Sequence, residues 1–387
     1  MEGDQRSHRT TGGRLDWLDA LRGLAILGVV LVHTGQSVRI ESGFWHQITS
    51  AGQYGVQLFF IVSALTISIT YDSYVDKFGP SFRTAAAWFI KRFFRIAPLY
   101  YFAIVFYSIE QYAIYIGSHH RYGHLPRPFP DILANAFFIH TWVPSANNTV
   151  VPGGWSIGVE VFFYFLVPLI WLIPKGLVRA LVLGIAIVPI ISLSLLISIL
   201  SVGTSYIENN SFLYLWFPTQ YPVLAIGLIY FIVVINPQRQ VSTSRTSRLF
   251  FVAFLGLFVF GLAFGTWKAL QPVLSPFVVS LAFVCLIMSL KGAIKNALVN
   301  PIYIFLGKIS YSIYILHFVV LDAYKAAMFM QYGNHVPSPY LLLVVFPSVV
   351  FLTSGLAYLS KLFFEDPGIK FGHRLSNRIV APSGAPE

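Results

Sequence analysis

The sequence predicts an all-α membrane protein, a helical bundle of about ten transmembrane helices with both termini in the cytoplasm. Of its 387 residues, 56% are hydrophobic and only 11% are charged, and the mean hydropathy is +0.69, which excludes a soluble globular protein. The apolar residues fall into runs of about 20, the length that a helix needs to cross the hydrocarbon core. The Lys and Arg residues gather on alternate connections between these runs.

Ten apolar runs are expected to span the membrane, near 20–38, 52–71, 93–117, 154–173, 178–201, 212–235, 249–267, 273–290, 301–326 and 340–363. The run 131–143 is too short to span and is expected to be re-entrant or interfacial. Five of the 26 Lys and Arg residues lie on one set of alternate connections, and these are Arg39, Arg121, Arg127, Lys268 and Lys325. The other 21 lie on the opposite set. The positive-inside rule therefore predicts that both termini are cytoplasmic.

The expected organisation is a cytoplasmic N-terminal tail over 1–15, a transmembrane domain over 16–374 and a cytoplasmic C-terminal tail over 375–387. The first fifteen residues are polar and basic and lack the apolar segment of a signal peptide, so we expect the first span to be retained. The single cysteine, Cys285, can form no disulfide within one chain. The net charge of +11 follows the topology, and no nucleic-acid partner is expected.

The first span carries Arg22 and His33, residue types that are costly within a bilayer and usually functional there. Their separation puts both on one face of a helix, roughly 16 Å apart along its axis. We expect a cation at the membrane edge for an anionic donor and a titratable imidazole near mid-depth. Asp19 is expected to hold Arg22 through an i,i+3 ion pair. Alternatively, Arg22 is only one of the cations that flank the cytoplasmic end of the span, and His33 forms a hydrogen bond to another helix.

Arg92 and Arg95 share one helix face at the cytoplasmic start of the third span. Two guanidinium groups suit phosphate, which Arg binds bidentately, and a CoA thioester carries several phosphates. Anchoring of the cytoplasmic helix end is the alternative. At the end of the last span, Glu365 precedes Pro367, which is expected to end the helix. A salt bridge from Glu365 to a cytoplasmic Arg or Lys is its favoured role.

Glu160 lies inside the fourth apolar run, where an unpaired carboxylate is costly. Ser156 is expected to share its helix face, and Trp155 follows a turn at the outer face of the membrane. Glu160 could accept a proton, bind an acceptor hydroxyl or pair with a buried Arg.

Ser310, Tyr314 and His317 are spaced to form one stripe of the ninth span, and Tyr311 lies beside Ser310. The alternative is a row of hydrogen bonds that holds the helices together. The sequence has no HExxH motif, cysteine cluster, GxSxG elbow or Gly-rich nucleotide loop. We therefore expect no metal site and no bound cofactor.

Taken in order, these motifs resemble acyltransferase family 3, the membrane-bound O-acyltransferases of bacterial surface glycans. The matching pieces are LDALRGLAILGVVLVH, GVQLFFIVSALTI, RFFRIAPLYY, WSIGVEVFFY, SYSIYILH and the terminal Phe-Glu-x-Pro, from Arg14 to about Arg374. Ala64 stands where the family usually has Gly. We expect a stand-alone member, without the SGNH hydrolase-like domain that many members carry.

The resemblance implies transfer of an acyl group, usually acetyl, from cytosolic acyl-CoA to a hydroxyl of a carbohydrate. Lipopolysaccharide O-antigen, exopolysaccharide or another cell-envelope glycan, free or lipid-linked, would be the acceptor at the bacterial inner membrane. Acetyl-CoA is then the donor substrate, with its phosphates on Arg92 and Arg95, while Arg22 steers it. His33 would act as general base on the acceptor hydroxyl or carry the acyl group transiently.

The remaining candidates would orient the acceptor or support the fold. Glu160 and His317 would orient the sugar or His33, and the residues that could contact sugar or serve structure are Asp19, Trp155, Ser156, Ser310, Tyr311, Tyr314 and Glu365. The expected partners are acyl-CoA, the glycan, the lipid bilayer and a protein of glycan assembly. A glycan transporter or flippase is the alternative function, because buried charges also suit a substrate pathway, although the sequence shows no internal repeat.

Overall fold

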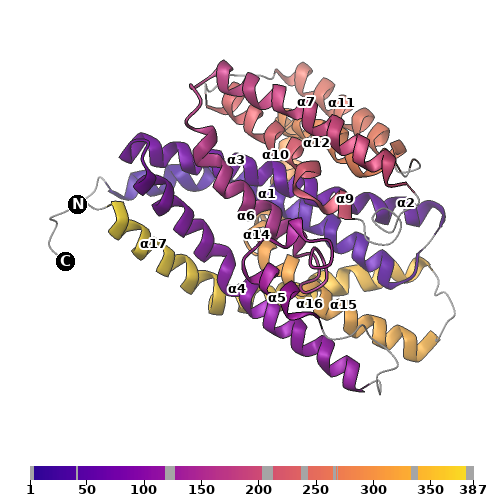
Figure 1. Cartoon of the computed structure of the whole chain (residues 1–387). Coiled ribbons are helices and arrows are strands. Elements are labelled where there is room, and N and C mark those ends of the chain that lie inside the picture. The colour runs from indigo at the N-terminus through magenta and orange to yellow at the C-terminus, as the bar shows by residue number, and fades with distance from the viewer. Residues whose placement is uncertain are drawn as a thin grey trace. The chain divides into compact units, whose positions relative to one another are not determined.

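A computed structural model of the chain describes residues 4–40, 42–117, 127–202, 212–236, 243–264, 267, 269–332 and 339–380. These residues are helical almost throughout and include no β-strand, which confirms the predicted all-α class. Figure 1 colours the helices by residue number, from indigo at the N-terminus to yellow at the C-terminus. The chain divides into two compact units, each assembled from segments that are distant in the sequence.

The first unit comprises residues 1–62, 240–263 and 278–358. It contains α1 (Asp4–Ser37), α2 (Gly43–Ala51), η1 (Gly52–Tyr54), the start of α3 (Gly55–Phe78), α11 (Ser244–Ala263), the end of α12 (Gln271–Met288), α13 (Gly292–Leu298), α14 (Pro301–Lys308), α15 (Ser310–Tyr332), η5 (Pro339–Leu341) and most of α16 (Leu342–Ser360). Helix α1 is central to this unit because it contacts α2, η1, α13, α14 and α15. It begins at Asp4, so the predicted N-terminal tail continues the first helix.

Two glycines allow α1 and α14 to pack backbone against backbone. A Cβ atom at Gly23 would overlap the backbone of Tyr303, and one at Gly307 would overlap the backbone of Asp19. The side chain of Asn300 caps the start of α14 by accepting from the Tyr303 amide at 3.0 Å. Small residues are the usual means by which membrane helices approach closely. They place the Arg22 end of α1 directly against α14.

The second unit comprises residues 63–239, 264–277 and 359–387. It contains the rest of α3, α4 (Phe82–Gly117), α5 (Phe129–Ala136), η2 (His140–Trp142), α6 (Trp155–Ile170), α7 (Leu177–Leu200), α9 (Phe212–Leu215), α10 (Phe217–Tyr230), η3 (Phe231–Ile235), the start of α12, η6 (Lys361–Glu365) and α17 (Asp366–Val380). Helix α17 lies along α4, as Figure 1 shows. The short helices α5 and η2 agree with the expectation that 131–143 does not span the membrane.

The expectation that Pro367 ends the last helix was wrong. A π-helical turn, η6, leads directly into α17, which continues to Val380. Pro367 follows this π-helical turn directly, at the point where the hydrogen-bond register of the helix changes, so the chain accommodates the proline without ending the helix. The ion pair of Lys361 with Asp366, at 2.8 Å, joins the two segments. The first residues of the predicted C-terminal tail are therefore helical.

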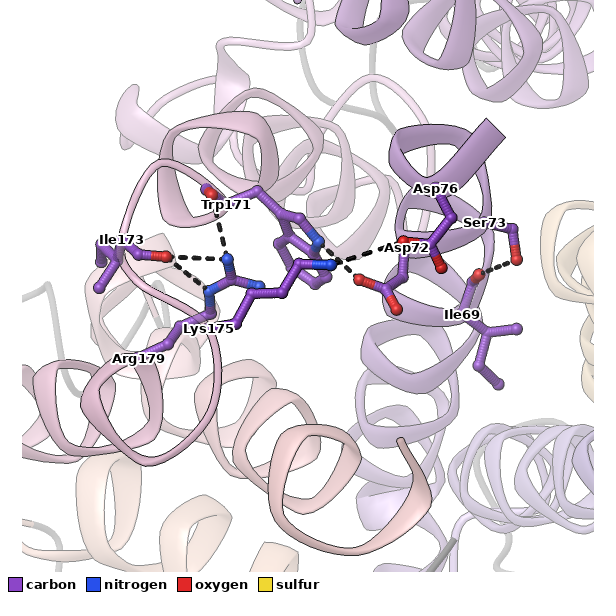
Figure 2. Close-up of polar contacts among 8 residues, drawn as sticks. All are labelled: Ile69, Asp72, Ser73, Asp76, Trp171, Ile173, Lys175 and Arg179. Carbon is purple, nitrogen blue, oxygen red and sulfur yellow. Dashed lines mark hydrogen bonds and ion pairs between the residues drawn. The ribbon is translucent and has the colours of Figure 1, made fainter. Parts of the chain in front are cut away.

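Polar contacts lock the end of α6 to α3 and α7, as Figure 2 shows. The Trp171 indole N–H donates to the Asp72 carboxylate at 3.0 Å. The Arg179 guanidinium donates to the carbonyl oxygens of Trp171 at 3.0 Å and Ile173 at 2.8 Å, and it lies over the Trp171 ring at 4.6 Å. Arg179 thus satisfies carbonyls that the end of α6 would otherwise leave unpaired.

Seven helical segments of the described chain are long and apolar enough to cross a membrane. They are Asp16–Ser37, Gly43–Phe78, Leu177–Leu200, Phe212–Ile235, Arg245–Ala263, Gln271–Met288 and Leu342–Val380. The predicted span 301–326 is not one straight helix, since α14 and α15 meet at 79°. If these two helices are counted as one span, the described chain has eight candidate spans.

The multi-pass membrane class is confirmed, and the structure supports seven or eight spans by length and composition where the sequence predicts about ten. The other two predicted spans, 93–117 and 154–173, lie in α4 and α6. Helix α6 has only 16 residues, below the length that a span needs. Helix α4 has 36 residues, but its charged residues and tyrosines lower its hydropathy.

Candidate functional site

Two of the predicted site residues, His33 on α1 and His317 on α15, lie side by side in the first unit. Their ring centroids are 5.3 Å apart at an interplanar angle of 37°. The Phe318 ring packs on both, 4.6 Å from His33 and 4.1 Å from His317. The His317 side chain is fully buried. The structure therefore brings together two imidazoles that are 284 residues apart in the chain.

The partners of the two imidazoles define which nitrogen carries the proton in each. His317 Nδ1 lies 3.1 Å from the carbonyl oxygen of Ile313, which can only accept, so Nδ1 donates. His33 Nδ1 lies 3.0 Å from the side-chain oxygen Oε1 of Gln36 and donates likewise. In both rings Nε2 then presents its lone pair, and His317 Nε2 is buried without a hydrogen-bond partner among the described residues. The pair offers two basic nitrogens in an apolar setting.

Arg22 and Asp19 form the ion pair that their spacing predicts, at 2.9 Å. The contact holds the guanidinium against α1 near the close approach of α14. Within α15, Ser310 lies at the bend after α14, and the Tyr314 ring lies 6.1 Å from His317 and 6.2 Å from Phe59. Ser310 and Tyr314 are buried and Tyr311 is half-buried.

In the second unit, the Glu160 carboxylate receives two hydrogen bonds on the same oxygen. Ser63 Oγ on α3 donates to Oε1 at 2.9 Å, and the Tyr164 hydroxyl, one turn further along α6, donates at 2.7 Å. Ser156, which the sequence places on the same helix face, instead donates to the Gly153 carbonyl at 3.2 Å. Trp155 packs its ring 6.1 Å from that of Tyr214.

Arg92 is buried, and its Nη2 donates to the Thr70 hydroxyl at 2.5 Å and the Thr66 carbonyl at 3.3 Å. Arg95, one turn further along α4, is half-buried. The Arg92 Cζ atom lies 5.8 Å from the centroid of the Trp88 ring, and Trp88 in turn meets the Tyr164 ring edge-on at 5.7 Å. Trp88 and Tyr164 therefore connect the Glu160 carboxylate to the Arg92 guanidinium, which the sequence singled out separately.

Glu365 is buried in η6, which packs against α4, the helix of the two arginines. Glycines again allow this contact. A Cβ atom at Gly368 would overlap the Phe94 backbone, and one at Gly372 would lie 2.8 Å from Phe94 Cβ. The end of the chain thus braces the helix that carries Arg92 and Arg95. The predicted salt bridge of Glu365 stays a prediction.

The sequence reasoning missed Ser63, Thr70, Trp88 and Tyr164, which contact the predicted residues directly. Helical spacing could have found two of them, because Tyr164 follows Glu160 by four residues and Trp88 precedes Arg92 by four. No such signal existed for Ser63 and Thr70, since they lie on a different helix from the groups that they contact.

His140 was also missed, and its surroundings indicate a structural role. Its Nε2 donates to the Gly154 carbonyl at 2.9 Å and lies 3.3 Å from the Tyr100 hydroxyl, which donates to Asn135 at 2.9 Å. Burial in this network, outside the candidate spans, lowers the pKa of His140 to about 4. The imidazole ties the segment before α6 to α4.

Chemically, the first unit supplies two imidazole groups in contact, and the second unit supplies a hydrogen-bonded carboxylate and two guanidinium groups. Bases and cations are what acyl transfer from an anionic donor requires. No group of three or more His, Cys, Asp or Glu side chains that could hold a metal occurs in the described part of the chain.

Comparisons with known proteins agree with this chemistry. Residues 15–359 match the acyltransferase-3 family model, described as an acyltransferase domain. Two proteins of Staphylococcus aureus, from strains COL and MW2 and both named, provisionally, as O-acetyltransferases, are 23% identical over 380 residues. The match covers 93% of this chain but only 58% of theirs. No solved structure matches the chain. Because the family model covers most of its length, the chain belongs to acyltransferase family 3.

Proposed function

We propose that this protein is a membrane-bound O-acyltransferase that moves an acyl group, acetyl in the simplest case, from acyl-CoA to a carbohydrate hydroxyl. The acceptor is lipopolysaccharide O-antigen, exopolysaccharide or another envelope glycan, and the enzyme resides in a bacterial inner membrane with both termini in the cytoplasm. The family supports acyl transfer, and the positive-inside pattern supports the topology. The observation that carries the proposal is the contact of His33 with the buried His317.

In the proposed reaction, His33 Nε2 takes the proton of the acceptor hydroxyl, and the hydroxyl oxygen attacks the thioester carbonyl carbon. The carbon–sulfur bond then breaks, and the CoA thiolate leaves and receives the proton from His33. Imidazole suits this exchange because its ordinary pKa lies near neutral pH. His317 orients His33 or the sugar. In the alternative sequence, His33 itself carries the acyl group, which predicts ping-pong kinetics.

The cationic residues serve the donor in this proposal. Arg92 and Arg95 bind CoA phosphates, for which guanidinium groups are well suited, and Arg22 steers the donor. Glu160 orients the acceptor. Trp155, Tyr311 and Tyr314 offer aromatic faces to sugar rings, and a lipid-linked acceptor or a partner protein of glycan assembly would supply the glycan.

The test is transfer of radioactive acetyl from acetyl-CoA to a membrane glycan extract by the purified protein in proteoliposomes. We expect His33→Gln to lower the transfer rate by about 10²- to 10⁴-fold, the usual contribution of a general base. His46→Gln is the matched control, because His46 is an exposed histidine on α2 that bonds to the Ile40 carbonyl. Binding of glycan without CoA release would instead indicate a transporter. Full activity of His33→Gln would refute the assigned base.

A further inference from the structure

Three helices of the second unit each present a pair of polar or aromatic residues to one small region. Helix α3 contributes Ser63 and Thr70, two turns apart, α4 contributes Trp88 and Arg92, and α6 contributes Glu160 and Tyr164. We call Ser63, Thr70, Trp88 and Tyr164 the Trp88 network.

One end of the Trp88 network orients the Glu160 carboxylate. Ser63 and Tyr164 both donate to Oε1, and Oε2 receives no hydrogen bond from the described residues. Hydrogen bonds to a charged acceptor are stronger than those between neutral groups. Two of them on one oxygen fix the carboxylate plane and leave the other oxygen available to an incoming group.

The other end orients the Arg92 guanidinium through the Thr70 hydroxyl. Thr70 Oγ1 accepts from Arg92 Nη2 at 2.5 Å and from the Trp88 indole N–H at 3.1 Å, and it donates to the Thr66 carbonyl at 2.8 Å. A hydroxyl has one donor and two acceptor positions, so all three are in use. Thr70 therefore cannot rotate without losing a partner, and Arg92 is held with it.

Trp88 joins the two ends. Its ring meets the Tyr164 ring edge-on at 5.7 Å, and the Arg92 Cζ atom lies 5.8 Å from its centroid. Trp88 and Tyr164 are each only 1% exposed, so neither has room to reorient. The carboxylate and the guanidinium thus share one rigid support.

We infer that Tyr164 and Thr70 are positioning residues, Tyr164 for the Glu160 carboxylate and Thr70 for the Arg92 guanidinium. The inference rests on the proposed function, in which Arg92 binds the donor and Glu160 acts at the acceptor. It assigns the two ends of one network to two different kinetic steps. Loss of the Thr70 hydroxyl impairs donor binding, whereas loss of the Tyr164 hydroxyl impairs transfer from the bound donor.

The experiment measures kcat and KM for acetyl-CoA in the label-transfer assay, together with direct CoA binding and the melting temperature. We expect Thr70→Val to raise KM and the Kd for CoA by about 10-fold or more, with kcat within roughly threefold of wild type. We expect Tyr164→Phe to lower kcat by about 10- to 100-fold with little change in CoA binding. Thr70→Ser restores the hydroxyl and should restore CoA binding.

Matched controls come from the same unit. Tyr221→Phe alters another buried tyrosine, and Thr219→Val removes a buried hydroxyl that has no hydrogen-bond partner among the described residues. Both should keep wild-type kinetics. If both Thr70→Val and Tyr164→Phe instead lower kcat, raise KM and lower the melting temperature together, the two residues have only a structural role and the inference is overturned.

The two proposals fail in different ways. Transfer by wild type with unchanged kinetics in Tyr164→Phe and Thr70→Val overturns the positioning inference alone. Absence of transfer by wild type, with every acceptor preparation and with no CoA binding, overturns the proposed function and the inference with it.

Discussion

Gly23→Ala tests the close contact of α1 with α14, on which the position of the Arg22–Asp19 pair depends. A Cβ atom at residue 23 would lie 2.8 Å from the carbonyl carbon and 2.9 Å from the Cα atom of Tyr303, and closer still to the carbonyl oxygen. These atoms belong to the backbone of α14. Side-chain rotation therefore cannot relieve the overlap, and the two helices must move apart.

The expected magnitude follows from two opposing terms. Alanine is the better helix former and by itself would stabilise α1 by up to about 1 kcal/mol. An additional methyl group in a packed interface costs about 1–3 kcal/mol. We therefore expect Gly23→Ala to lower the free energy of unfolding by about 1–2 kcal/mol. Gly307→Ala should behave alike, because its Cβ atom would overlap the Asp19 backbone.

The control is Gly256→Ala on α11, since no heavy atom of the described residues lies within 4 Å of a Cβ atom placed there. This variant should keep or slightly raise the stability. Thermal unfolding in detergent can be followed by circular dichroism and by dye labelling of Cys285, the only cysteine. If Gly23→Ala melts at or above the temperature of Gly256→Ala, the backbone contact between α1 and α14 is incorrect.

Two further predictions concern stability in the second unit. Asp72→Ala leaves the buried Trp171 indole N–H without its acceptor and should lower the free energy of unfolding by about 1–3 kcal/mol. Asp76→Ala removes an exposed ion pair of 3.5 Å and should lower it by less than about 1 kcal/mol. Equal melting temperatures of the two variants would contradict this prediction. His140 should make the fold acid-labile, because burial lowers its pKa in the folded protein to about 4, below the ordinary value of 6.5. Its contribution to the stability is therefore constant above pH 6.5 and is lost between pH 6.5 and 4, as the unfolded chain binds a proton that the folded chain excludes. The full loss of unfolding free energy is on the order of 3 kcal/mol. The melting temperatures of wild type and His140→Gln, measured from about pH 7.5 to 4.5, check this prediction, and the same pH dependence in both proteins would refute it.

Much of the local structure was predictable from the sequence. Hydropathy and charge determine the membrane class, and run length places most helices, because a bilayer demands long apolar segments. The i,i+3 spacing of Asp19 and Arg22 led to the ion pair that the structure contains. Such predictions succeed because a helix fixes the neighbours of a residue within one or two turns.

Helix ends and breaks were less predictable. The bend between α14 and α15 falls inside one apolar run, and α17 continues past Pro367. Both α14 and α15 are apolar, so hydropathy does not mark the bend between them, and a proline that a π-helical turn accommodates looks in sequence like a proline that stops a helix. Only the packing of each segment against its neighbours decides between these outcomes.

Which helix faces meet was a matter for the tertiary structure alone. The sequence identified His33, His317, Arg92 and Glu160 as functional candidates, because ionisable side chains in apolar runs are costly. It left open whether His317 lies against His33 or the sugar, and it did not indicate that Ser63 donates to Glu160 from 97 residues away. Periodicity defines the faces of one helix but carries no information on its partner. In a bilayer, where lipid is as apolar as leucine, close contacts of small residues and interhelical hydrogen bonds select that partner.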